Sequence, residues 1–184
     1  GVLKKMIHDA CKKEEYHTLV VGLGNRDVTP DALGPRVVDN LFITRHMVKE
    51  YGKYAFGEER VNSISGLVPG VMAQTGMESL EIIKGVVNQT KPDFIITIDA
   101  LAARSTKRLG CTIQLTDTGI VPGSGVGNHR NRISHENIGV PVISIGIPTV
   151  IDAVTIVSDA VNANRDMTEK LMSPKLNGMF VTPK

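Results

Sequence analysis

The sequence predicts a three-layer α/β domain, in which a mainly parallel sheet carries helices on both faces. Short, β-branched apolar runs alternate along the chain with longer segments whose apolar residues recur at helical spacing. The short runs are apolar at nearly every position rather than at every second one, which is typical of strands covered on both faces. The chain shows no internal repeat and no linker, so we expect a single domain over residues 1–184.

Each element is predicted from its local pattern. Five short apolar runs bounded by glycine, proline or polar residues predict strands near residues 18–23, 61–65, 94–99, 111–115 and 140–147. Amphipathic stripes predict helices over residues 2–15, 31–51 and 77–89. A last helix is expected to start near Pro148, because proline is favoured at the first helical position. Residues 179–181 are predicted to add an edge strand.

Composition excludes several classes of protein. The 184 residues include only two cysteines, Cys11 and Cys111, which rules out a disulfide framework and suits a reducing compartment. A net charge of +2 with few aromatic residues gives no case for nucleic-acid binding. The longest uncharged apolar stretch, residues 138–151, is too short to span a bilayer. Because the first residue is Gly1, we expect a fragment or a processed chain.

Two aspartates are the strongest candidates for chemistry. In open α/β sheets the functional site lies beyond the carboxyl ends of the strands. Asp31 stands where the loop after the first strand meets a helix, and on position alone it fits a helix cap. Asp99 follows five apolar residues, and alone it is either a structural anchor or a catalytic group. Two carboxyls on neighbouring parallel strands can share one crevice, where one holds a proton and the other acts as a base.

Other motifs are weaker. Asp117-Thr118-Gly119 looks like the triplet of aspartic proteases, but a single copy in an α/β setting favours a strand-end turn. The glycine-rich segment over residues 119–128 is either a backbone nest for an anion or peptide, or a surface turn. The five histidines lack metal-site spacing, so we predict no metal and no cofactor. No spacing supports Ser124 as a nucleophile.

Several segments resemble, in the same order over about residues 18–160, the core of the germination proteases of spore-forming bacteria. They are Val-Val-Gly-Leu-Gly-Asn (20–25), Val-Thr-Pro-Asp-Ala-Leu-Gly-Pro (28–35), Pro-Gly-Val-Met (69–72), Lys-Pro-Asp-Phe (91–94), Ile-Asp-Ala-Leu-Ala (98–102), Ser-Gly-Val-Gly-Asn (124–128) and Gly-Ile-Pro-Thr-Val (146–150).

This resemblance implies an atypical aspartic endopeptidase with the fold of hydrogenase maturation proteases. It implies that Asp31 and Asp99 are catalytic and that the substrates are small acid-soluble spore proteins, degraded in the spore core, which is cytoplasmic, during germination. It further implies an inactive precursor, a homotetramer, and no membrane or direct nucleic-acid partner. Only one predicted helix precedes the first strand and the region after residue 160 is short, so N-terminal and some C-terminal family segments are expected to be lacking.

Substrate contacts and two alternative functions complete the sequence-based expectations. Arg45, Arg104 and Lys107 are candidates for contacting acidic residues near the cleaved bond, and Asn25 for orienting the site. One alternative function is a metal-dependent enzyme like a maturation protease. The other is a non-catalytic module that binds a peptide or an anion. The sequence does not assign the proton to one carboxyl of the pair, because coupled groups titrate together.

Overall fold

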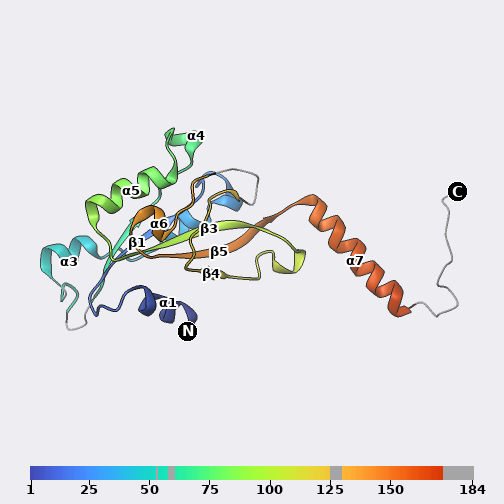
Figure 1. Ribbon diagram of the computed structural model, residues 1–184, viewed down its shortest axis with the longest axis horizontal. Coiled ribbons are helices and arrows are strands. Elements are labelled where there is room, and N and C mark those ends of the chain that lie inside the picture. Colours follow the sequence, from blue (N-terminus) through green and yellow to red (C-terminus); the bar gives the residue numbers. More distant parts are fainter. Residues whose placement is uncertain (53, 58–60, 125–129, 172–184) are drawn as a thin grey trace.

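A computed structural model describes residues 1–52, 54–57, 61–124 and 130–171, and their side chains as far as residue 164 (Figure 1). It contains a five-stranded sheet with the order β2-β1-β3-β5-β4. The first four strands in this order are parallel to one another, and the edge strand β4 is antiparallel to β5. The strands are β1 (His17–Gly22), β2 (Ser63–Leu67), β3 (Phe94–Ala103), β4 (Gln114–Thr116) and β5 (Val142–Ile151).

Helices cover both faces of this sheet, which confirms the predicted three-layer α/β fold. In Figure 1, α1 lies on one side of the sheet and α5 on the other. The remaining elements connect the strands or flank them. The helices are α1 (Val2–Ala10), η1 (Thr29–Asp31), α2 (Leu33–Asp39), α3 (Arg45–Tyr51), α4 (Met72–Thr75), α5 (Ser79–Thr90), η2 (Thr106–Arg108), α6 (His135–Ile138) and α7 (Ala153–Leu171).

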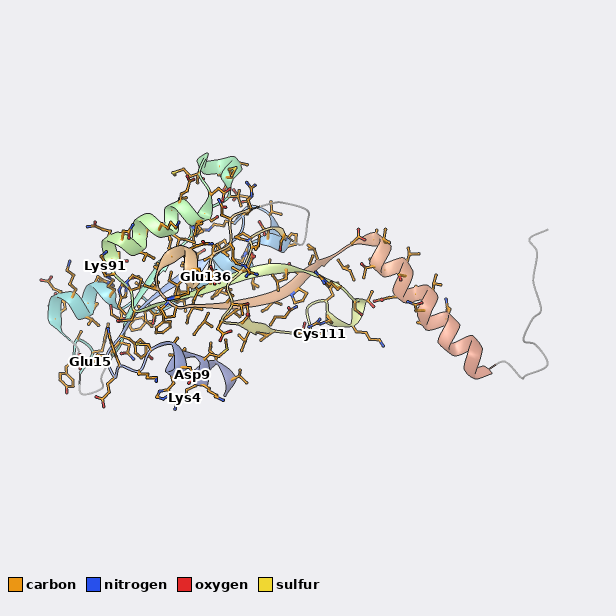
Figure 2. The ribbon with its side chains drawn as sticks, viewed as in Figure 1. Lys4, Asp9, Glu15, Lys91, Cys111 and Glu136 are labelled. Carbon is orange, nitrogen blue, oxygen red and sulfur yellow. The ribbon has the colours of Figure 1, made fainter. Side chains whose placement is uncertain are left out.

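The two faces of the sheet bury different residues because side chains alternate along a strand. On the α5 face, Leu19 and Val21 of β1 pack with Ile83 and Val87 of α5. On the α1 face, Phe94 of β3 packs with Cys11 and with the apolar stripe of α1. The opposite side of α1 carries Lys4 and Asp9, both exposed (Figure 2).

Two glycines allow α2 to lie directly against the sheet. A Cβ on Gly22 would stand 2.2 Å from the carbonyl oxygen of Gly34, and a Cβ on Gly34 would stand 2.4 Å from the carbonyl oxygen of Leu23. Real Cβ atoms do not come so close to a backbone oxygen, so only glycine fits at either position. This approach fixes the start of α2 beside β1 and therefore fixes the loop that carries Asp31.

The helix predicted over residues 31–51 is wrong as a continuous element. The chain forms η1, α2 and α3 in its place. Between α2 and α3, the Thr44 hydroxyl donates to the carbonyl of Asn62 at 2.6 Å and accepts from the N–H of Ile64 at 2.9 Å. These bonds hold the break against β2. The apolar spacing continues across it, so periodicity alone does not reveal it.

The prediction of a helix from Pro148 is also wrong, because β5 continues through Pro148 to Ile151 and α7 begins at Ala153. The carbonyl of Pro148 accepts from the N–H of Gly110, so this carbonyl faces away from β3, and proline has no N–H that would need a partner there. The register between β3 and β5 shifts at the same place, between Leu101 and Ala102. Proline is tolerated in strands at such irregularities.

The other boundaries differ by a few residues. The first helix ends at Ala10 rather than at 15, β2 and β4 start two and three residues later than predicted, and β3 runs on to Ala103. The edge strand predicted at residues 179–181 lies outside the described residues.

The helix α7 extends away from the sheet (Figure 1). Asp159 of α7 accepts hydrogen bonds from the Thr106 N–H at 2.7 Å and from the Ser105 and Thr106 hydroxyls, and these bonds attach α7 to η2. Neither α7 nor another helix in the described part of the chain combines the length and apolarity needed to cross a bilayer.

Candidate active site

A cavity of about 790 Å³ opens where β1 ends beside β3. Its walls come from segments far apart in sequence: the loop after β1, the second half of β3, residues 70–73 before and in α4, residues 121–124 and the irregular part of β5. Both Asp31 and Asp99 line it. The structure thus brings the two predicted aspartates into one crevice at the carboxyl end of β1.

Asp31 is held at the end of η1 by backbone groups. Its Oδ2 atom accepts from the N–H of Asn25 at 2.7 Å, a hydrogen bond suited to a carboxylate. Gly24 has φ 112, and a Cβ there would stand 2.1 Å from the carbonyl oxygen of Asp31, so the tight turn requires glycine. The Thr149 hydroxyl of β5 donates to the Pro30 carbonyl at 2.6 Å, which fixes η1 to the sheet.

Asp99 lies inside β3 rather than at its end, which corrects the position expected from the sequence. The strand continues four residues beyond it. Asp99 lines the cavity because β1 ends beside it. The pairing of β1 with β3 ends at Gly22 opposite Ile98, and the next bond runs from the Leu23 N–H to the Ile98 carbonyl at 2.8 Å. Asp99 is 5% exposed, and its Oδ1 atom accepts from the N–H of Ala100 at 2.9 Å.

Burial and a second negative charge alter the acidity of Asp99. Burial raises its pKa to about 7, and the charge of Asp31 acts in the same direction, while the bond from the Ala100 N–H acts against them. A carboxyl with such a pKa is protonated in about half of the molecules at neutral pH and can therefore serve as a general acid or a general base there. Perturbed acidity of this kind in a cleft is typical of functional sites.

Asn25 links the Asp31 loop to the segment around α4. Its side-chain oxygen accepts from the Asp27 N–H at 3.0 Å and from Nε2 of Gln74 at 3.1 Å. Gln74 belongs to α4, and its Oε1 atom accepts from the Val71 N–H at 3.4 Å. Asn25 therefore positions Asp31 through its own backbone N–H and braces the opposite wall of the cavity through its side chain.

The basic residues of the cavity are only partly those expected. Arg104 lines it, together with Arg108 and Arg130, which the sequence reasoning missed. Of the described side chains, Arg45 and Lys107 are not among the lining residues. Arg45 lies near His17 at the amino end of β1, where burial and, to a smaller extent, the charge of Arg45 lower the pKa of that imidazole. A signal for Arg130 existed, since it lies two residues after the glycine-rich segment.

Other sequence motifs take clear places around the site. Asp117 is exposed and follows the end of β4, in a turn where the Thr118 N–H donates to the Thr116 hydroxyl. Residues 121–124 of the glycine-rich segment, Ser124 included, line the cavity, whereas residues 125–128 lie outside the described residues. Among the described side chains no group of three histidines, cysteines or acids is placed to bind a metal.

Comparison with known proteins gives relatives of one kind. A family model described as Germination protease matches residues 1–173. Germination proteases from Caldanaerobacter subterraneus subsp. tengcongensis and Priestia megaterium are 57% and 58% identical, over 78% and 72% of this chain and 44% and 35% of their own lengths. The Bacillus subtilis protein is 58% identical over 69% of this chain and 34% of its own length.

A [NiFe] hydrogenase maturation protease, HycI from Thermococcus kodakarensis KOD1, is similar in structure, with a TM-score of 0.46 and 18% identity over 93% of this chain and 99% of that one. The matched part of the chain covers 34–44% of the length of these curated relatives. Its match to the family model runs over nearly the whole sequence. The chain therefore belongs to the germination protease family.

Proposed function

We propose that this protein is an endopeptidase that uses Asp31 and Asp99 to activate water, and that it degrades small acid-soluble spore proteins during germination. The observation that carries the proposal is one cavity containing two carboxyls, of which the more buried has a pKa of about 7. Membership of the germination protease family supports the biological role. The substrate class is taken from the family resemblance of the sequence.

We propose separate roles for the two carboxyls. Asp31 is less buried than Asp99 and its Oδ2 atom accepts a backbone N–H, and we propose it as the base. Asp99 is buried and has a pKa of about 7, so a large fraction of the molecules keep its proton up to neutral pH, and we propose it as the acid. Asp31 takes a proton from water while the water oxygen bonds to the peptide carbon, and the proton of Asp99 passes to the carbonyl oxygen.

Collapse of the resulting gem-diol completes the reaction. The C–N bond breaks, the proton on Asp31 passes to the leaving nitrogen, and one hydroxyl proton returns to Asp99. Both carboxyls then regain their starting states, and one water has been consumed. Each step needs only general acid and base groups, which together contribute about 10²–10⁴-fold to a rate.

The guanidinium groups of Arg104 and Arg108 are proposed to contact acidic side chains of the substrate near the cleaved bond. Both residues line the cavity and are exposed. Neither forms an ion pair with a described residue. Arg130 donates to the Met72 sulfur at 2.9 Å, so it is partly engaged within the protein.

Incubation of the purified chain with small acid-soluble spore protein tests this function. Discrete product masses, formed equally after exhaustive chelation with EDTA, are expected. Loss of activity on chelation with recovery on adding nickel or zinc would show a metal-dependent enzyme. Intact substrate held in a stable complex would show a binding module. Three further properties stay predictions from the resemblance: homotetramer formation, precursor processing and location in the spore core. Light scattering during size-exclusion chromatography measures the molecular mass and so checks the homotetramer.

A further inference from the structure

The open edge of β3 beside the two aspartates is the feature with a function not yet assigned. β1 pairs with β3 only as far as Gly22 opposite Ile98, and β3 continues from Asp99 to Ala103. The other edge of this extension remains paired with β5. The edge that faces away from β5 therefore has no neighbouring strand among the described residues.

Alternation of the backbone identifies the groups on this edge. The Ile95 N–H donates to Pro141 on the β5 side, whereas the Ile98 carbonyl accepts from Leu23 on the β1 side. In a parallel ladder the N–H and the carbonyl of one residue point the same way, and the next residue points the opposite way. Continuing from Ile98, Ala100 and Ala102 face the open edge. The N–H of Ala100 is already bonded to Asp99, which leaves its carbonyl and both groups of Ala102.

These free groups border the cavity that holds the carboxyl pair. Ala100, Ala102 and Arg104 all line it, and none of the three alternating positions has a bulky apolar side chain that would fill the space. At about 3.3 Å per residue, the open edge extends roughly 10 Å beyond Asp99. A strand paired there has its backbone beside the carboxyls and its side chains within reach of the guanidinium of Arg104.

We propose that an extended segment of the substrate polypeptide docks as an added strand on the Ala100–Ala102 edge of β3, which presents its scissile bond to Asp31 and Asp99. A single residue of a parallel strand donates its N–H to the Ala100 carbonyl and accepts from the Ala102 N–H, without disturbing the bond between Ala100 and Asp99. Strand addition to an exposed edge is a general mode of peptide recognition. The acidic character of the bound segment follows from the arginines at the end of the edge. This inference rests on the proposed peptidase function.

Amide hydrogen exchange at Ala102 tests the docking edge without requiring turnover. The probe is small acid-soluble spore protein, added in excess to the Asp99→Asn variant of the full chain. The side-chain oxygen of this variant can still accept from the Ala100 N–H. Exchange of the Ala102 N–H is expected to slow by about tenfold or more on binding, the effect of a new hydrogen bond of roughly 1.4 kcal/mol. The Leu101 N–H, which faces β5, is the internal control and should not change.

Cleavage by the unaltered chain is measured in parallel, so that the two proposals fail separately. Cleavage with unchanged Ala102 exchange would overturn the docking edge and leave the peptidase intact. No cleavage with slowed Ala102 exchange would overturn the peptidase and keep the edge as a binding site. No cleavage and no slowing would overturn both. Where cleavage occurs, N-methylation of alternate amides of a peptide spanning the cleaved bond should weaken binding with a period of two residues, and uniform sensitivity would contradict strand addition.

Discussion

Asp99 illustrates how a single residue balances stability against chemistry. A carboxyl that is 5% exposed and faces a second carboxyl is more costly to ionise in the folded protein than in the unfolded chain, and its pKa of about 7 records this. Because the folded-state pKa lies above the unfolded-state value, the unfolded chain loses its proton first as the pH rises. Stability conferred by protonated Asp99 is therefore complete below about pH 4 and is lost between about pH 4 and 7.

Replacing Asp99 with asparagine should remove this pH dependence. Between pH 4 and pH 8, the unaltered protein should lose stability that the Asp99→Asn variant keeps. Relative to the unaltered protein, the free energy of unfolding of the variant is therefore expected to rise by on the order of 4 kcal/mol over this range. Urea unfolding at several pH values measures it. Asp117→Asn, at an exposed position, is the matched control and should track the unaltered protein. A constant difference for Asp99→Asn across this range would contradict the environment described for Asp99.

Substitution of a single arginine in the cavity wall should affect substrate binding more than the chemical step. Arg104→Gln should raise KM for spore protein by roughly two- to fivefold with little change in kcat, since an exposed charge pair contributes about 0.5–1 kcal/mol. Lys107→Gln is a matched control, because Lys107 lies three residues away but is not in the cavity wall. Steady-state kinetics at low and physiological salt check both. An equal effect of the two substitutions would show that only overall charge matters.

Among the elements, the contact of α2 with β1 positions the loop that carries Asp31. Gly22→Ala places a methyl group where the Gly34 carbonyl stands, and should reduce the free energy of unfolding by at least about 1–3 kcal/mol while displacing Asp31. Thermal unfolding and peptidase assays measure the two effects. Gly85→Ala in α5 is the matched control: no heavy atom lies within 4 Å of the added Cβ, and alanine should stabilise the helix by about 0.5–1 kcal/mol. A stable, fully active Gly22→Ala variant would contradict the role of this contact.

The elements also show which structural features sequence patterns can predict. The runs that became β1 and β3 are apolar at nearly every position, so burial on both faces was evident, and the parallel arrangement followed from the intervening helices. The break after α2 depends on a hydroxyl from Thr44 bonding to distant β2, and the strand through Pro148 depends on a register shift against β3. Neither tertiary interaction leaves a local signature.

The candidate site divides in the same way. Asp99 could be singled out because it directly follows a buried apolar run, and Asp31 because it stands where the loop after the first strand meets a helix. The sequence did not predict Arg108 or the open edge of β3 as parts of the site. They become part of it only because β3 is longer than β1. Strand length in turn depends on pairing with β5, which sequence periodicity does not report.

At the scale of the whole molecule, the cavity depends on segments that meet only in the folded chain. Asn25 and Gln74 join the loop after β1 to the segment around α4, and the extension of β3 lines the same cavity. The central claim is that this assembly makes one acid–base pair from Asp31 and Asp99. We expect the exposed Asp117, in the triplet that resembles that of aspartic proteases, to take no part in it.

The most direct measurement is the turnover of small acid-soluble spore protein by Asp31→Asn, Asp99→Asn and Asp117→Asn, each shown by circular dichroism to be folded. Asparagine is nearly isosteric with aspartate but cannot serve as the acid or the base. Asp31→Asn and Asp99→Asn should each lose at least about 10²–10⁴-fold in kcat, and Asp117→Asn should retain most of the activity. Near-normal turnover by Asp99→Asn, or abolition by Asp117→Asn alone, would contradict the assigned pair.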